Sequence, residues 1–369
     1  MKFIVALDSF KGSMSSYQAG KIVEKEILRS FPTSEVKLFP LGDGGEGTLE
    51  ALIRFQKVRR KNCKVLDPKG KEINSYYGVM ADAVYLESSL VIGLPLMKDK
   101  LDPLNASTYG LGLLLKEIGN KYSKIYLGLG GSATSDGGAG ALAALGVEFY
   151  DSRHRKFIPT GKTLNKIKEI NATDLVELPP LILLSDVNNP FDGFNGAAYI
   201  YGPQKGASPK EVEYLDQGLK NFAGFFPKKI LNQKGTGAAG GLAGGLLAFY
   251  PQTKIVSGIK EVLRLSDFTE ELKDTDYLFT GEGLLDRSSL NGKLIQGILK
   301  ENKGKAKVIA LVGGVKDKEI GKLYSQGLTA VFTINRLPLA YKDSKKDAKD
   351  NLRNTVSDIL RLISQICYN

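Results

Sequence analysis

Histidine and cysteine are scarce in this sequence of 369 residues, which has one histidine, His154, and two cysteines, Cys63 and Cys367. Two cysteines cannot form a disulfide framework or a four-cysteine zinc site, and a single histidine excludes any metal centre with several histidine ligands. A Ser-His-Asp hydrolase would depend on His154 alone, and its neighbours Arg153 and Arg155 indicate a surface loop. These classes of zinc protein and hydrolase are therefore not expected.

Long apolar runs are also absent. A run of only five apolar residues, 3–7, precedes Asp8, which is too short for a secretory signal and is typical of a buried strand. Residues 235–253 carry no charge, but six of them are glycine and Pro251 interrupts them. Large apolar side chains are therefore too few there for a membrane span. We expect a cytoplasmic protein with no membrane partner.

Basic residues outnumber acidic ones by 51 to 40, which gives a net charge of +11. The densest basic runs, residues 57–61 and 342–349, have no aromatic residues between their charges to stack on bases. We interpret both runs as solvated surface and expect no nucleic-acid partner, and we keep a basic nucleic-acid-binding protein as an alternative. A positive field also raises the encounter rate of small anionic substrates.

Short apolar runs followed by helical patterns indicate the fold class. Six such runs are typical of strands buried on both faces: residues 3–7, 36–41, 124–129, 277–280, 308–312 and 330–334. After the first run, Ala19, Val23 and Ile27 have the spacing of one helical face, and apolar residues from Ala348 to Ile366 predict a final helix. The alternation predicts an α/β fold with a six-stranded, mainly parallel, Rossmann- or flavodoxin-like sheet flanked by helices.

Two stretches interrupt this alternation. They contain further strand-like runs, at residues 74–80, 83–86, 147–150, 181–185 and 197–201. Ser208 to Glu211 also predicts a helix start, with an N-cap serine, an N1 proline and a capping-box glutamate. We predict that residues 57–120 and 146–270 form an inserted α/β domain and that 1–56, 121–145 and 271–369 form the parallel-sheet domain. The crevice between the two domains is the expected active site.

Three glycine-rich segments follow predicted strands and also contain carboxylates and hydroxyls. They are residues 42–48, 128–138 and 280–286. Because the carboxyl ends of parallel strands meet at one edge of a sheet, we expect these segments to converge. Glycine lets backbone N–H groups approach an anion, and carboxylates suit Mg²⁺ or a substrate hydroxyl that must lose its proton. The combination predicts phosphoryl transfer.

Two other nucleotide-binding motifs match less well. Gly128-x-Gly130-x-x-Ala133 fits the dinucleotide fingerprint, but Asp136 would face a pyrophosphate unfavourably without a cation. The Gly-Lys-Thr of residues 161–163 matches the end of a P-loop, but Lys156 stands where the first glycine belongs. An NAD-dependent hydroxy-acid dehydrogenase is therefore the second enzyme hypothesis.

Six motifs in a fixed order resemble one family. They are residues 8–13 (DSFKGS), 43–48 (DGGEGT), 130–138 (GGSATSDGG), 202–209 (GPQKGASP), 237–242 (GAAGGL) and 280–286 (TGEGLLD). Together they resemble the type-1 glycerate kinase family from residue 1 to about 340. The resemblance implies ATP- and Mg²⁺-dependent phosphorylation of D-glycerate to 2- or 3-phosphoglycerate, by a six-stranded parallel α/β domain with a second one inserted. Leu284, Asn188 and Ser135 depart from the family pattern, which usually has arginine, aspartate and asparagine there.

This hypothesis assigns a role to each candidate side chain. The expected catalytic residues are Asp186, Asp43 and Lys11, with either aspartate as the base. The expected substrate ligands are Asp8, Ser9, Lys205 and Asn188. The expected nucleotide ligands are Gly44, Gly45, Gly130, Gly131, Ser132, Thr134, Thr280, Gly281 and Lys293, and the expected metal ligands are Asp286 and Glu282. The number of metal ions and a homodimeric state are left open.

Overall fold

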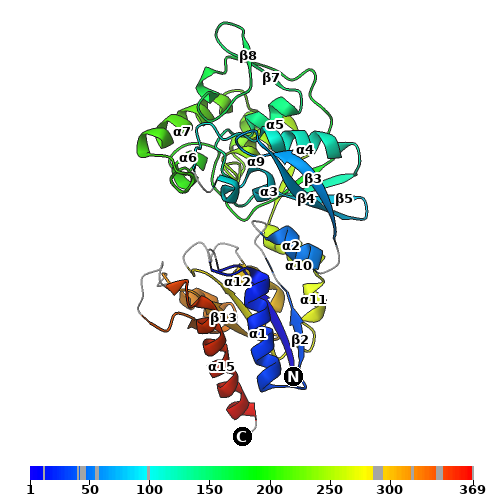
Figure 1. Ribbon diagram of the computed structural model, residues 1–369, viewed down its shortest axis with the longest axis vertical. Coiled ribbons are helices and arrows are strands. Elements are labelled where there is room, and N and C mark those ends of the chain that lie inside the picture. Colours follow the sequence, from blue (N-terminus) through cyan, green and yellow to red (C-terminus); the bar gives the residue numbers. More distant parts are fainter. Residues whose placement is uncertain are drawn as a thin grey trace. The chain divides into compact units, whose positions relative to one another are not determined.

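The chain divides into two compact units, which are described separately. The computed structural model describes residues 1–10, 13–39, 41, 47–54, 58–97, 100–285, 294–316, 320–337 and 344–367. Unit 1 consists of Met1–Asp43, Glu50–Lys57 and Ile259–Asn369, and unit 2 consists of Gly44–Leu49 and Val58–Gly258 (Figure 1).

The described part of unit 1 contains a five-stranded parallel sheet in the order β14-β13-β12-β1-β2. Its strands are β1 (Lys2–Leu7), β2 (Glu35–Leu38), β12 (Tyr277–Glu282), β13 (Lys307–Val312) and β14 (Leu328–Thr333). Nearly every residue of β1, β12 and β13 is buried, as their uninterrupted apolar sequences predict. Five of the six predicted strands are therefore confirmed as members of one sheet.

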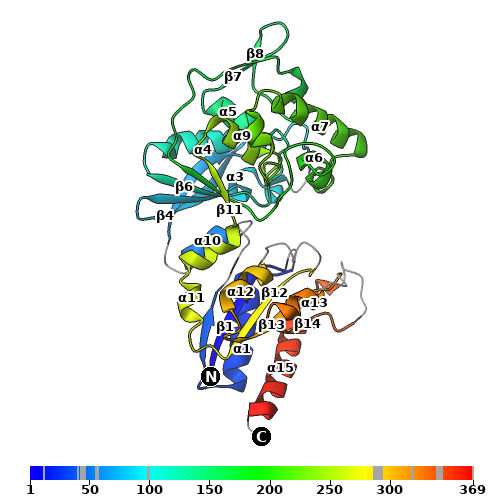
Figure 2. The same cartoon turned by 180° about the vertical axis from the view of Figure 1, so that it is seen from behind.

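Helices cover both faces of this sheet (Figures 1 and 2). Helices α1 (Ser16–Ser30) and α15 (Ala348–Cys367) pack together on one face, and α12 (Leu294–Asn302) covers the other. The predicted α1 face is confirmed, since Ala19, Val23 and Ile27 are buried in one cluster with β1. Ile366 is 65% exposed, so the buried face of α15 ends one turn earlier than predicted. The shorter helices are α2 (Thr48–Arg54), α10 (Gly258–Leu265), α11 (Phe268–Glu271) and α13 (Gly321–Ser325).

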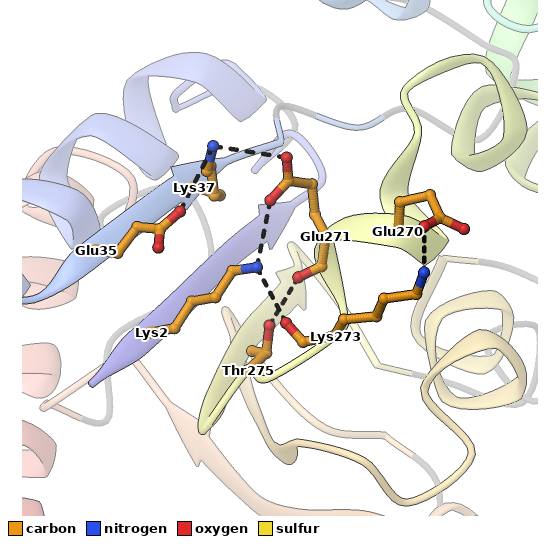
Figure 3. Close-up of polar contacts among 7 residues, drawn as sticks. All are labelled: Lys2, Glu35, Lys37, Glu270, Glu271, Lys273 and Thr275. Carbon is orange, nitrogen blue, oxygen red and sulfur yellow. Dashed lines mark hydrogen bonds and ion pairs between the residues drawn. The ribbon is translucent and has the colours of Figure 1, made fainter.

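Charged side chains connect α11 to strands β1 and β2 (Figure 3). Glu271 pairs with Lys2 at 3.3 Å and with Lys37 at 3.5 Å. Lys2 also donates a hydrogen bond to the carbonyl oxygen of Lys273 at 3.0 Å, and Thr275 donates to that of Glu271 at 2.9 Å. Because these ion pairs are partly exposed, each contributes at most about 1 kcal/mol, so they mainly orient the segment that leads into β12.

In the residues described for unit 2, six strands form a mixed sheet in the order β11-β10-β6-β5-β4-β3. Its strands are β3 (Arg59–Leu66), β4 (Glu72–Met80), β5 (Ala83–Glu87), β6 (Lys124–Gly128), β10 (Leu181–Leu184) and β11 (Lys254–Val256). Strands β5, β6, β10 and β11 are mutually parallel, whereas β3 and β4 are joined antiparallel. The carboxyl ends of the four parallel strands therefore lie along one side of the sheet, which we call the carboxyl edge.

Helices and a small second sheet complete unit 2. Its other strands are β7 (Glu148–Tyr150), β8 (Lys156–Phe157) and β9 (Glu169–Asn171). Its helices are α3 (Ser89–Ile92), η1 (Leu94–Met97), α4 (Tyr109–Gly119), α5 (Ala139–Ala144), η2 (Leu164–Lys166), α6 (Ala197–Tyr201), η3 (Pro203–Lys205), α7 (Pro209–Ala223), α8 (Lys228–Leu231) and α9 (Leu242–Phe249). The predicted capping box of Ser208 and Glu211 is present at the start of α7. No helix in the described part of the chain is both long and apolar enough to cross a bilayer.

Two predictions from the sequence are wrong. Strand β6 pairs with β5 and β10, so residues 121–145 belong to unit 2 and not to the parallel-sheet domain of unit 1. Residues 197–201 form helix α6 because Ala197 and Ala198 pack into the core beside α7. The prediction of solvated surface for the basic run at 57–61 is confirmed for its described part, since Arg59, Arg60 and Lys61 are exposed on β3, where cations suit an edge strand that must not pair with another chain.

Candidate active site

The carboxyl edge of unit 2 gathers side chains from segments that are far apart in the sequence. Glu87 ends β5, Gly130 follows β6, and Asp186 follows β10. The parallel register pairs Gly128 with both Glu87 and Leu184, so these three strand ends lie side by side. The structure thus brings the second glycine-rich segment and Asp186 into one unit, whereas the sequence assigned them to different domains.

The glycine-rich turn after β6 is held in place by Lys205. Its Nζ donates to the carbonyl oxygen of Thr134 at 2.5 Å and to the hydroxyl of Ser132 at 3.3 Å, and the residue is only 2% exposed. Gly240 packs against the same turn, and its carbonyl oxygen accepts from the Gly137 N–H at 3.0 Å. The turn is therefore fixed from two sides.

Asp136 is fully buried beneath this turn. Its carboxylate accepts hydrogen bonds from the N–H and hydroxyl of Thr108 at 2.8 Å each, and from the N–H groups of Gly138 and Gly140 at 3.1 and 3.3 Å. Burial raises the pKa of Asp136, and these donors oppose the increase. Burial lowers the pKa of Lys205 to about 7, and the charge of Asp136 opposes that decrease. Each buried charge thus favours the ionised form of the other.

Glu87 anchors the end of the first glycine-rich segment. Its carboxylate accepts from the N–H groups of Gly47 and Leu49 at 2.9 and 3.1 Å and from the hydroxyl of Ser89 at 2.5 Å, and it is only 4% exposed. Sequence reasoning missed Glu87. The signal was an acidic residue directly at the end of a predicted apolar strand, which is where polar site residues occur in α/β sheets.

Asp186 lies at the carboxyl edge with a defined orientation. Its Oδ1 accepts a hydrogen bond of 2.6 Å from the hydroxyl of Ser257, which follows β11, and its side chain is partly exposed. Asn188 is exposed nearby in sequence, whereas Asn189 holds the loop by donating to the carbonyl oxygen of Asn195 at 2.9 Å. Asp186 is therefore a carboxylate that is both oriented and accessible.

Unit 1 carries a second group of candidate residues where β1 and β12 end. The register pairs Leu7 with Gly281, and the N–H of Asp8 donates to the Gly281 carbonyl oxygen at 2.9 Å, which brings Asp8 beside Glu282. A Cβ on Gly281 would lie 1.8 Å from a backbone oxygen of β13, so only glycine fits there. Asp8, Ser9, Thr280, Gly281 and Glu282 thus share one strand edge.

The remaining predicted residues lie outside the described part of the chain. They are Lys11, Asp43, Gly44, Gly45, Asp286 and Lys293. Within the described ranges, no three or more His, Cys, Asp or Glu side chains gather as metal ligands. Mg²⁺ in kinases is usually held by only one or two carboxylates together with substrate phosphates. Asp8 and Glu282 follow the paired residues Leu7 and Gly281, and the buried Thr280 hydroxyl has no partner in the described residues, so the residues at this strand edge supply the hard oxygen donors that suit this ion.

Comparisons with known proteins show the family to which this chain belongs. The model of the glycerate kinase family matches residues 3–364. A glycerate kinase of Haemophilus influenzae is 34% identical over 99% of both chains, and a glycerate 2-kinase of Escherichia coli is 32% identical over 95% of both. The crystal structure of a Salmonella typhimurium LT2 protein, described as a glycerate kinase 2, covers 100% of both chains at 30% identity with a TM-score of 0.80. The chain therefore belongs to the glycerate kinase family.

Proposed function

We propose that the protein transfers the γ-phosphoryl group of ATP to D-glycerate and forms phosphoglycerate. Membership of the glycerate kinase family supports this reaction. The observation that carries it is the glycine-rich turn locked by Lys205 beside an oriented carboxylate, Asp186, at one strand edge. The six ordered motifs support the type-1 branch of the family, an α/β nucleotide-binding domain with a second domain inserted. The relatives named above are glycerate kinases, and the partial dinucleotide fingerprint at 128–133 is the only motif that favours the dehydrogenase alternative.

The turn after β6 is suited to bind an anionic group of the substrates. Gly130 and Gly131 let backbone N–H groups approach closely. Because Lys205 donates to the oxygen of Ser132, the Ser132 hydroxyl proton is directed away from Lys205 and is available to a phosphate or carboxylate. We assign Lys205 an indirect role, since its own ammonium is 2% exposed. It supplies positive charge beneath the turn and acts on the substrate through Ser132.

Asp186 is the proposed base for the attacking hydroxyl of glycerate. The hydrogen bond from Ser257 fixes its carboxylate, so the proton acceptor is oriented before substrate binds. Phosphoryl transfer through a loose transition state needs little base strength, so an aspartate suffices. Asp43, which lies outside the described residues, is the alternative base. Lys11, Asp8, Ser9 and Asn188 are proposed to bind the carboxylate and hydroxyl groups of glycerate.

Thr280, Gly281 and Glu282 are assigned to the metal-nucleotide side of the reaction, with Asp286 and Lys293. Bound Mg²⁺ would neutralise charge on the phosphate oxygens. Glu282 with Asp286 would hold the ion, and Asp8 is the neighbouring carboxylate on β1. The glycine at position 281 keeps β12 and β13 close enough for these side chains to remain at the strand edge.

The 2-hydroxyl of glycerate is the proposed acceptor, because the Escherichia coli relative is named glycerate 2-kinase. A coupled assay of ATP consumption with D-glycerate, L-glycerate, glycolate and lactate, followed by phosphorus NMR of the product, tests both parts. We expect turnover with D-glycerate and a 2-phosphoglycerate signal. A 3-phosphoglycerate signal would contradict the regiochemistry alone. NAD-dependent oxidation of these acids without ATP consumption would contradict the kinase assignment.

A further inference from the structure

A cavity of about 700 Å³ lies among β3, β4, α3 and η1 of unit 2, within the size range of sites for small molecules. The residues used below are Arg60, Cys63, Lys64, Tyr76, Ser89 and Leu90. None of the lining residues has a role in the reaction proposed above, and none of those described is acidic. We call this space the β3–β4 cavity.

Positive charge marks one side of the β3–β4 cavity. The guanidinium of Arg60 lies 3.8 Å from the centre of the Tyr76 ring, and its Nε donates to Asn62 at 3.1 Å. Among the described residues no carboxylate pairs with Arg60, so none of them neutralises its charge. Lys64 pairs with Glu72 at 2.8 Å, so this ion pair adds no net charge to the β3–β4 cavity. The uncompensated guanidinium favours an anion, which it can bind with two parallel N–H donors.

Apolar surface marks the other side. Leu90, Pro95 and Leu96 line the cavity together with the ring of Tyr76, so a fully hydrated inorganic ion would leave much of the space unfilled. We propose that the β3–β4 cavity binds a small organic anion, with a carboxylate or phosphate group at Arg60 and an apolar or aromatic body against Leu90 and Tyr76. Glycerate, which has no apolar body, does not fit this description.

Residues 89–96, which form the apolar wall of the β3–β4 cavity, also contact residues at the carboxyl edge of unit 2. Ser89 lines the cavity and donates to Glu87, which holds Gly47 and Leu49. A few residues later, the N–H of Leu94 donates to the carbonyl oxygen of Gly131 at 2.8 Å. A ligand in the β3–β4 cavity therefore touches the segment on which two glycine-rich turns rest. We expect binding of this ligand to change the KM for glycerate. This expectation rests on the proposed function, whereas the binding of the ligand does not.

Cys63 provides a readout confined to the cavity. It lines the space, and the only other cysteine is Cys367. Burial raises the pKa of the Cys63 thiol, so alkylation by iodoacetamide is best followed near pH 8.5 in the full chain carrying Cys367→Ser. Phenyl phosphate and benzoate are the probes, and phenol and inorganic phosphate are the controls. We expect either probe to slow alkylation at least fivefold, and the stronger one identifies the preferred anionic group.

Arg60→Gln should abolish this protection, whereas Arg153→Gln, which removes an exposed cation of the same unit, should leave it intact. Absence of protection by both probes, equal protection by phenol, or full protection in Arg60→Gln would overturn the site. In parallel, saturating probe should change the KM for D-glycerate at least twofold in the wild-type chain and not in Arg60→Gln. An unchanged KM with Cys63 protected would overturn the connection through Ser89. Because alkylation needs neither ATP nor glycerate, failure of this site is distinct from failure of the kinase assignment.

Discussion

The buried ammonium of Lys205 donates a hydrogen bond to the carbonyl oxygen of Thr134 at 2.5 Å. This contact joins a lysine of η3 to the turn after β6, across 71 positions of the sequence. A lysine that is 2% exposed must recover the hydration it loses, and here it does so from Thr134, Ser132 and the charge of Asp136. The glycine-rich turn after β6 and the buried ammonium of Lys205 therefore stabilise each other.

Stability should depend on pH through Lys205. Burial lowers its pKa to about 7 in the folded chain, against 10.5 for an ordinary lysine. Between these values the unfolded chain binds more protons than the folded one, so the free energy of unfolding rises with pH by at most about 1.4 kcal/mol per unit. Denaturant unfolding from pH 6 to 9 should show wild type gaining stability relative to Lys205→Met above pH 7. Parallel curves would contradict the burial of this charge, and Lys162→Met, at an exposed lysine, is the control.

Gly240→Ala should disrupt the turn directly. Gly240 has φ +69°, and a Cβ there would lie 2.0 Å from the Thr134 oxygen and 2.9 Å from Lys205 Nζ. Gly70→Ala is the matched control, because Gly70 has φ +80° but no atom within 4 Å of the added carbon. We expect a loss of about 1 kcal/mol for Gly70→Ala and at least about 2 kcal/mol more for Gly240→Ala. Equal losses in denaturant unfolding would show that the turn can move away from position 240.

Asp186→Asn should lower kcat at least about 100-fold, because the proposed proton acceptor is lost. The KM for ATP should change less than threefold, since the carboxylate is assigned to glycerate and not to the nucleotide. Ser257→Ala should reduce kcat by a smaller factor, since it removes only the hydrogen bond that orients Asp186. Asp174→Asn, at an exposed aspartate, is the control. A near-normal kcat in Asp186→Asn would contradict Asp186 as the base and favour Asp43.

Glu87→Gln should weaken both stability and turnover. The amide offers one acceptor oxygen where the carboxylate has two, and its NH₂ group would face an N–H donor of Gly47 or Leu49. We expect the free energy of unfolding to fall by about 1–3 kcal/mol. We also expect a lower kcat, because Gly47 belongs to the glycine-rich segment 42–48 that is proposed to bind substrate. Glu72→Gln, at an exposed glutamate, should change stability by less than about 0.5 kcal/mol. Unchanged thermal unfolding of Glu87→Gln would contradict the anchoring role.

Much of the secondary structure could be predicted from the sequence, but its assignment to sheets could not. Strands buried on both faces have the same continuous apolar pattern in either unit, so residues 124–129 gave no indication that they pair with β5 and β10. Ala197–Tyr201 has strand-like composition, and only packing against α7 makes it helical. Tertiary contacts decided both cases.

The parts of the candidate site that could be predicted from the sequence are its glycine-rich segments. The turn at 130–138 and the edge at 280–282 were identified because three segments of this chain combine glycine with carboxylates and hydroxyls, and each follows a predicted strand. Thr108 was missed because a single threonine has no sequence context that shows what it will bind. Glu87 was missed because its only signal is its place at the end of a predicted strand. The burial of Lys205 was equally hidden, because it results from folding of the 130–138 and 237–241 segments over it.

The pairing of β1 with β12 affects how the protein is made. Phe3 pairs with Tyr277, so β1 is synthesised about half a minute before its partner β12, at typical rates of about 5–20 residues per second. All six strands of the sheet in unit 2 come from the continuous stretch 58–258, so that sheet can form while translation continues. Until β12 is synthesised, β1 can pair only with β2, so one side of this apolar strand stays without its neighbouring strand.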